Sequence, residues 1–128
     1  MKGLTLLAAG LLAFSGVASA DNGPVTMRGL GIVSCSQYLA VRKEPGVTPN
    51  KAGYNQWAQG FMTGLNVALY MKFKKYADLP DSDSMNQWLS TYCSANPLKP
   101  FNEAVSDLMV ERSMSLENIN VREILNKE

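Results

Sequence analysis

The chain has 128 residues, of which 12 are Lys or Arg, 11 are Asp or Glu and none is His. A formal charge of +1 argues against a nucleic-acid-binding protein, because phosphate backbones need a strongly basic face. The absence of His removes the commonest general base and metal ligand, so we expect no metal and no cofactor.

The first 20 residues are expected to be a secretory signal peptide. Lys2 precedes an apolar run from Leu4 to Phe14, and the small residues Ala18 and Ala20 then form a site for cleavage after Ala20. The run is shorter than the roughly 20 residues of a membrane span, which predicts no membrane anchor. Removal of Lys2 leaves 12 minus 1, or 11, basic residues against 11 acidic ones. The mature chain, residues 21–128, is expected to be one domain in the periplasm.

A short first helix is predicted over GIVSCSQYLAVR, because Ile32, Cys35 and Leu39 share one helical stripe. KEPG should end this helix, since the residue before Pro45 avoids the α region.

The longest helix is predicted from Pro49 to Phe73, with Thr48 as its N-cap. Its apolar residues recur at spacings of three and four, and the predicted buried stripe is Tyr54, Trp57, Phe61, Leu65 and Ala68. Gly60 and Gly64 each cost about 1 kcal/mol relative to Ala, so we expect another helix to cross closely there. The alternative is a ligand that approaches the glycine face.

Two further helices follow. One of the residues 81–84 should cap the third, whose buried stripe is Met85, Trp88, Leu89, Tyr92 and Cys93, and Asn96-Pro97 should end it. Pro100 should open the fourth, with Phe101, Ala104, Val105, Leu108, Met109 and Arg112 on one stripe. SLENINVREILNKE is expected to add a short C-terminal helix, and a frayed tail is the alternative. Without two-residue alternation anywhere, the predicted fold is an all-α bundle of four or five helices.

Cys35 and Cys93 are the only cysteines, and in an exported protein an even pair predicts a disulfide. The alternatives to a disulfide are weaker. A redox site would need a C-x-x-C motif, which the chain lacks, and a zinc site would need more ligands than two thiols. The bridge is expected to join the first helix to the third.

We expect no enzyme. The chain has no His, no phosphate loop and no nucleophile elbow, and Asp81 and Asp83 are only formal candidates for a carboxylate pair that cleaves glycosides. Helix capping explains these two aspartates equally well.

The segments SCSQYL, QWAQGFMTGLN and WLSTYCSANPLKPFNEAV resemble the Rap/Tai family of periplasmic immunity proteins, which act against type VI secretion amidase effectors. The resemblance spans about residues 35 to 110, and it implies an all-helical, usually dimeric inhibitor that occupies the cleft of a peptidoglycan amidase. The matching residues are Trp57, Gly60, Phe61, Gly64, Asn66, Trp88, Leu89, Tyr92, Cys93, Asn96, Pro97 and Ala104. They are chiefly structural, so they transfer no inhibitory residue.

The rival function comes from a different class of protein. Periplasmic acid-stress chaperones similar to HdeA are also small, exported and helical with one disulfide, and CSQYLAV is similar to their start. Prevention of aggregation at acid pH would indicate the chaperone, and tight binding of one amidase at neutral pH would indicate the inhibitor.

The expected partner-binding segment is KFKKYADLPDSDS, residues 72–84, which joins the second and third helices. Connections on a rigid scaffold commonly carry recognition, and separated charges orient a partner. The candidate contacts are Tyr76, Asp78, Leu79, Asp81 and Asp83. A solvated loop before a capped helix is the simpler alternative.

Overall fold

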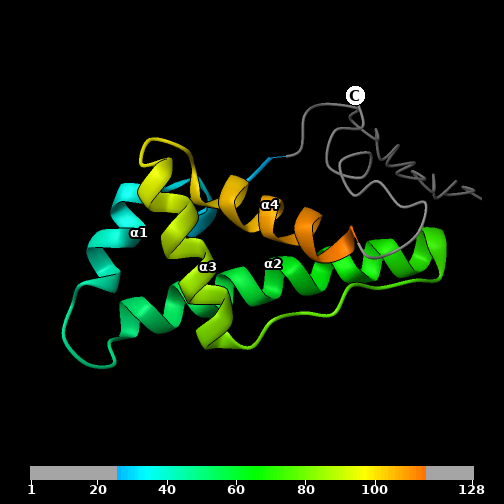
Figure 1. The fold of residues 1–128 in the computed structure, drawn as a ribbon, viewed down its shortest axis with the longest axis horizontal. Helices are drawn as coiled ribbons and strands as arrows, with labels where there is room; N and C mark the ends of the chain where they lie inside the picture. The colour runs from blue at the N-terminus through cyan, green and yellow to red at the C-terminus, as the bar shows by residue number, and fades with distance from the viewer. Residues whose placement is uncertain (1–25, 115–128) are drawn as a thin grey trace, which may run out of the picture.

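The computed structural model describes residues 26–114, and this part of the chain is an all-α bundle without strands. A 3-10 helix, η1 (Gly29–Ile32), precedes α1 (Cys35–Arg42), α2 (Pro49–Phe73), α3 (Ser82–Ala95) and α4 (Phe101–Ser113). Figure 1 shows α4 beside the long α2, with α3 packed between α4 and α1 and with α1 at one end. The expected signal peptide and C-terminal helix lie outside the described residues.

Side-chain caps determine where three of the helices begin. Thr48 accepts a hydrogen bond from the Lys51 N–H, and Pro49 occupies the first turn of α2, as predicted. Asp81 caps α3 by accepting from the N–H groups of Asp83 and Ser84. These bonds satisfy amides that have no partner inside their own helix.

The first helix begins later than its apolar pattern predicts. Ser34 forms a capping box with Gln37, so α1 starts at Cys35, while the preceding turn is the separate helix η1. The prediction that Ile32 is buried is therefore wrong, and its side chain is 62% exposed. Tyr38 takes the buried position instead, one turn after Cys35.

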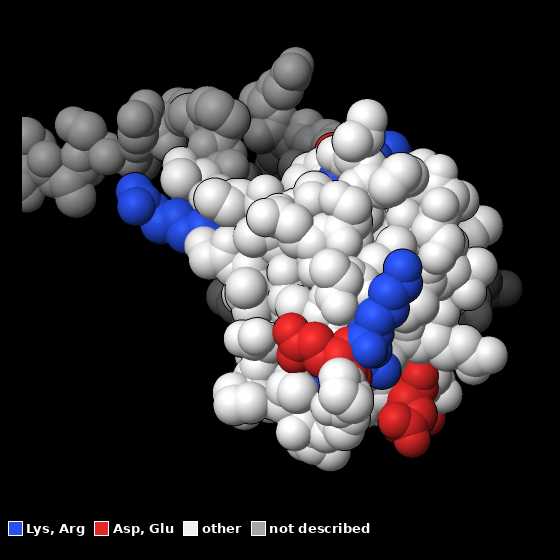
Figure 2. Space-filling model, turned by 90° about the vertical axis from the view of Figure 1, so that its left-hand side faces the viewer, with Lys and Arg blue, Asp and Glu red and all other residues white. Residues whose placement is uncertain are grey.

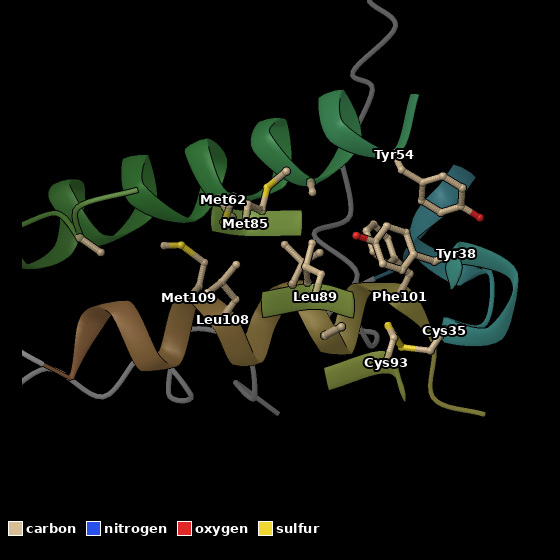
Figure 3. Close-up of a cluster of buried hydrophobic side chains, with 14 of the residues drawn as sticks. Cys35, Tyr38, Tyr54, Met62, Met85, Leu89, Cys93, Phe101, Leu108 and Met109 are labelled. Atoms are coloured by element: carbon tan, nitrogen blue, oxygen red, sulfur yellow. A yellow bond between two sulfur atoms is a disulfide. The ribbon is translucent and has the colours of Figure 1, made fainter. Parts of the chain in front are cut away.

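The core receives side chains from all four α-helices (Figure 3). At its α1 end, Tyr38 stacks on Phe101 with ring centroids 4.7 Å apart. The predicted disulfide between Cys35 and Cys93 is present, with its Cα atoms 4.9 Å apart and both residues fully buried. It fixes α1 to α3. The predicted apolar residues of α4 are all fully buried, as are Met85, Leu89 and Cys93 of α3, whereas Trp88, Tyr92 and Arg112 of the predicted stripes are only partly buried.

The buried stripe of α2 is displaced by one residue from the predicted one. Tyr54 is buried as expected, but Ala58, Met62 and Leu69 occupy the deepest positions, and the other predicted residues are only partly buried. The large Trp57 ring lies beside η1, where Gly31 leaves space for it. Trp57 and Phe61 therefore flank the core, while Ala58 and Met62 enter it.

The expected helix crossing at Gly60 and Gly64 is absent from the described residues. Both glycines are exposed, and a Cβ built on either would meet no atom there within 4 Å, the helix's own backbone aside. The packing interpretation is wrong, because this face of α2 points away from the bundle.

Candidate functional site

The connection between α2 and α3 is shorter than the predicted partner-binding segment, residues 72–84. Lys72 and Phe73 still belong to α2, and α3 already includes residues 82–84. The connection is Lys74–Asp81. Lys74 ends α2 in the left-handed conformation, with φ of 57°, and its N–H donates to the Tyr70 carbonyl. This reversal directs the chain back beside α2 (Figure 1).

Two polar contacts from α2 hold the returning chain. The Asn66 carboxamide donates to the Ala77 carbonyl and accepts from the Ala77 N–H, each at 2.9 Å. Nearer the start of α3, the Gln59 amide donates to the Ser82 hydroxyl at 2.8 Å. Because Ala77 is buried, both of its backbone groups need partners, and Asn66 supplies them. The connection is therefore fixed on the scaffold.

The five candidate contact residues have different structural roles. Tyr76 is 67% exposed, and Asp78 is also exposed. Leu79 is partly buried and packs against the core. Asp83 is exposed in the first turn of α3, where a negative charge is favourable beside the helix N-terminus. Of these side chains, Tyr76 offers the largest exposed apolar area.

The fifth candidate, Asp81, holds α3 in place. Its carboxylate accepts hydrogen bonds from the Ser84 N–H and from the Ser84 hydroxyl, at 2.9 and 2.8 Å. These two bonds lower the pKa of the Asp81 carboxyl. Capping thus accounts for this carboxylate, and replacing it together with Leu79 would disturb the scaffold as well as any contact surface.

Sequence reasoning missed three exposed apolar residues on the last turns of α2. Val67, Tyr70 and Met71 lie at the i, i+3, i+4 spacing of one helix face, which here points to solvent. We define the α2-end surface by the following exposed residues: Val67, Tyr70, Met71, Lys72, Lys74, Lys75 and Tyr76. The spacing was a signal in the sequence, but it lay opposite the stripe assigned to the core.

The α2-end surface combines apolar and basic groups. The Lys74 ammonium lies over the Tyr70 ring at 5.3 Å from the centroid, and the Lys72 ammonium lies 4.9 Å from that of Phe73. Three lysines within four positions make the local charge positive, although the whole chain is nearly neutral. The opposite end, at α1, shows a mostly uncharged surface with a few charges of both signs (Figure 2).

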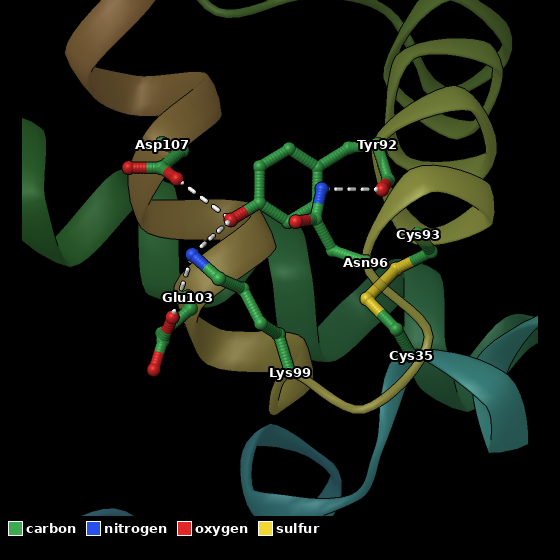
Figure 4. A network of polar contacts seen from close by, with 7 residues as sticks. All are labelled: Cys35, Tyr92, Cys93, Asn96, Lys99, Glu103 and Asp107. Atoms are coloured by element: carbon green, nitrogen blue, oxygen red, sulfur yellow. Dashed lines mark hydrogen bonds and ion pairs between the residues drawn. A yellow bond between two sulfur atoms is a disulfide. The ribbon is translucent and has the colours of Figure 1, made fainter.

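A second polar feature joins α3 to α4 (Figure 4). The Tyr92 hydroxyl donates to the Asp107 carboxylate at 2.7 Å and accepts from the Lys99 ammonium at 3.3 Å. Lys99 also pairs with Glu103 at 3.3 Å. Burial and the bond to Asp107 raise the pKa of the Tyr92 hydroxyl.

Within residues 26–114 there is no cluster of three or more Cys, Asp or Glu side chains suited to a metal ion. No helix in that range is both long and apolar enough to cross a bilayer.

Comparison with protein-family models, curated proteins and solved structures finds no match.

Proposed function

We propose that this chain is an exported binding protein that inhibits a peptidoglycan amidase, as the resemblance to the Rap/Tai immunity proteins implies. The α2-end surface makes the contact, and the disulfide-linked helices serve as the scaffold. The observation that carries this proposal is the pair of hydrogen bonds between the Asn66 carboxamide and the Ala77 backbone. They fix the backbone beside Tyr76 while leaving its side chain exposed.

Fixing the backbone favours tight binding for an entropic reason. A mobile loop loses conformational freedom when it binds, and that loss subtracts from affinity. Tyr76 is adjacent to a buried residue with both backbone groups bonded, so much of this freedom is already lost before binding. Tyrosine also supplies a large contact area with few rotatable bonds, which makes it a frequent interface anchor.

The composition of the surface favours a partner of complementary chemistry. Val67, Tyr70 and Met71 would pack against apolar groups, and the positive charge of the neighbouring lysines would attract carboxylates. We therefore expect an apolar depression with an acidic rim on the amidase. The carboxylates would contribute chiefly to the rate of association and to orientation.

The experiment is inhibition of amidase activity on purified peptidoglycan. The mature oxidised protein is first used to capture its partner from periplasmic extract, and the captured amidase is then assayed with increasing amounts of the protein. Stoichiometric inhibition at neutral pH supports the proposal. Full amidase activity in the presence of saturating protein contradicts it.

The same preparation tests the acid-stress chaperone. Suppression of aggregation of unrelated proteins at strongly acidic pH, without capture of an amidase at neutral pH, would replace the inhibitor by the HdeA-like function.

A further inference from the structure

A groove of about 610 Å³ lies on the outward side of α3 and shares no residue with the α2-end surface. Its volume is in the range of small-molecule sites, roughly 300–1,000 Å³. The lining residues that matter here are Ser84, Gln87, Trp88, Thr91, Asn96 and Arg112. Asn96 directly follows α3 as its C-cap, Arg112 belongs to α4, and the other four lie in α3, so the groove follows one face of α3 for about three turns.

The aromatic wall of the groove is held rigidly. Trp88 and Tyr92 are stacked with ring centroids 5.3 Å apart and planes 15° from parallel. The Trp88 indole N–H donates to Glu111 at 2.8 Å, and Tyr92 is bonded to Asp107. Because the polar atoms of both rings are bonded to carboxylates of α4, the rings present mainly carbon surface to a ligand.

Apart from Ala95, the remaining lining is polar, and only Arg112 in it is charged. Thr91 donates to the Gln87 carbonyl at 3.0 Å, and its hydroxyl oxygen keeps lone pairs to accept another bond. The Asn96 carboxamide donates to the Tyr92 carbonyl, and it carries a further N–H and an acceptor oxygen beyond that bond. Ser84 and Gln87 are exposed at the rim. The groove thus presents donors and acceptors beside an aromatic wall.

Charge narrows the class of ligand. Arg112 is the only charged residue among those lining the groove, while Glu111 and Asp107 lie behind the aromatic rings. The Lys99 ammonium also lies near the rings, 3.3 Å from the Tyr92 hydroxyl. A polyanion would therefore meet carboxylates as well as cations, and a polycation would meet Arg112 and Lys99. A neutral ligand avoids both conflicts.

We propose that this groove binds a neutral oligosaccharide, with a sugar ring packed on Trp88. The C–H face of a sugar matches the carbon surface of an aromatic ring, and its hydroxyls both donate and accept hydrogen bonds, as the rim requires. Gln87, Thr91 and Asn96 contact the hydroxyls. This site is independent of the proposed inhibition of an amidase, which uses the α2-end surface.

The test is saturation-transfer NMR and calorimetry with three probes: the tetramer of N-acetylglucosamine, cellotetraose and maltotetraose. We expect at least one tetramer to bind. Trp88→Ala should weaken that binding roughly tenfold or more, whereas Trp88→Phe, which also loses the bond to Glu111 but keeps a ring face, should weaken it less.

A second variant leaves the aromatic wall unchanged. Thr91→Leu fills part of the groove and should also weaken binding roughly tenfold. Thr63→Leu is its matched control, because Thr63 is an exposed residue of α2 with the same bond to the carbonyl four residues earlier, at 2.7 Å. This control should bind as the unmodified protein does.

Three results would overturn the assignment. The first is no binding of any tetramer to folded protein. The second is binding that Thr91→Leu and Thr63→Leu leave equally unchanged. The third is loss of amidase capture in Thr91→Leu without saccharide binding by the unmodified protein, which would make the groove a protein-docking surface. The inhibition assay with the unmodified protein distinguishes this outcome from a failure of the α2-end surface, because it measures inhibition of the amidase without any change in the groove.

Discussion

Replacing Gly64 by Ala should stabilise the protein. Gly64 lies in the interior of α2, its backbone has no positive φ, and an added Cβ would meet no described atom within 4 Å, the helix's own backbone aside. Ala avoids the conformational entropy that Gly loses in a helix, so the free energy of unfolding should rise by about 0.5–1 kcal/mol. For a domain of this size the midpoint of thermal unfolding should rise by about 2–8 °C.

The measurement is thermal and urea unfolding of the oxidised protein, followed by circular dichroism. Gly31→Ala is the matched control, because a Cβ there would lie 2.2 Å from Cζ2 of Trp57, whose ring is stacked on Phe61. Overpacking should lower the stability of this control by about 1–3 kcal/mol. A loss of stability in Gly64→Ala would refute the open glycine face and restore a close helix crossing. Gly64→Leu, which such a crossing would make destabilising, should be tolerated.

Three other predictions concern the scaffold. Replacing both Cys35 and Cys93 by Ala should lower the unfolding free energy by about 4 kcal/mol, from the entropy of a loop closed over 58 residues, and urea unfolding should detect it. Asn66→Ala should cost about 1–3 kcal/mol and increase hydrogen exchange at the Ala77 amide; unchanged exchange would contradict the anchoring of the connection. The pKa of Asp81 is lowered in the folded state, so its contribution to stability is complete above the ordinary value of 3.8 and is lost as the pH falls through the folded value. Asp81→Asn, a cap that does not titrate, should reduce the fall in melting temperature on acidification.

Local signals in the sequence account for most of the fold. Thr48, Asp81 and Pro100 mark the starts of α2, α3 and α4, since a cap or a proline acts within one turn of the chain. The disulfide followed from the number of cysteines and their positions on two apolar stripes. These features were predictable because each depends on residues close together in the sequence or, for the disulfide, on the pairing of two cysteines.

Features that depend on several helices together were less predictable. The rotation of α2 reflects where the Trp57 ring fits beside η1, and no periodicity within α2 contains that information. The prediction of a helix crossing at Gly60 and Gly64 was wrong. The low helix propensity of glycine suggests that something favours its presence, but it does not show that another helix packs there. Asn66 was seen in the sequence, but its bonds to Ala77 arise only when the chain returns beside α2.

The sequence predicted where the candidate site lies, but it did not predict all of the residues that form it. A charged connection containing Tyr76 was visible in the sequence, and Tyr76 is exposed. The apolar residues of α2 beside it could not be assigned to solvent, because a helix with apolar residues on two faces does not indicate which face the bundle covers.

The most direct test of the account is calorimetric titration of the captured amidase with the double variant Met71→Ala/Tyr76→Ala. Both side chains are exposed, at 72% and 67%, so the variant should keep the helicity and melting temperature of the unmodified protein. The control is Val47→Ala/Leu98→Ala, which removes apolar side chains that are 97% and 91% exposed on other connections.

Because a buried interface anchor costs about 2 kcal/mol or more when truncated, Met71→Ala/Tyr76→Ala should weaken the complex by at least tens of fold. The control should bind with full affinity. Full affinity of a correctly folded Met71→Ala/Tyr76→Ala variant would contradict the assignment of the α2-end surface as the site of inhibition.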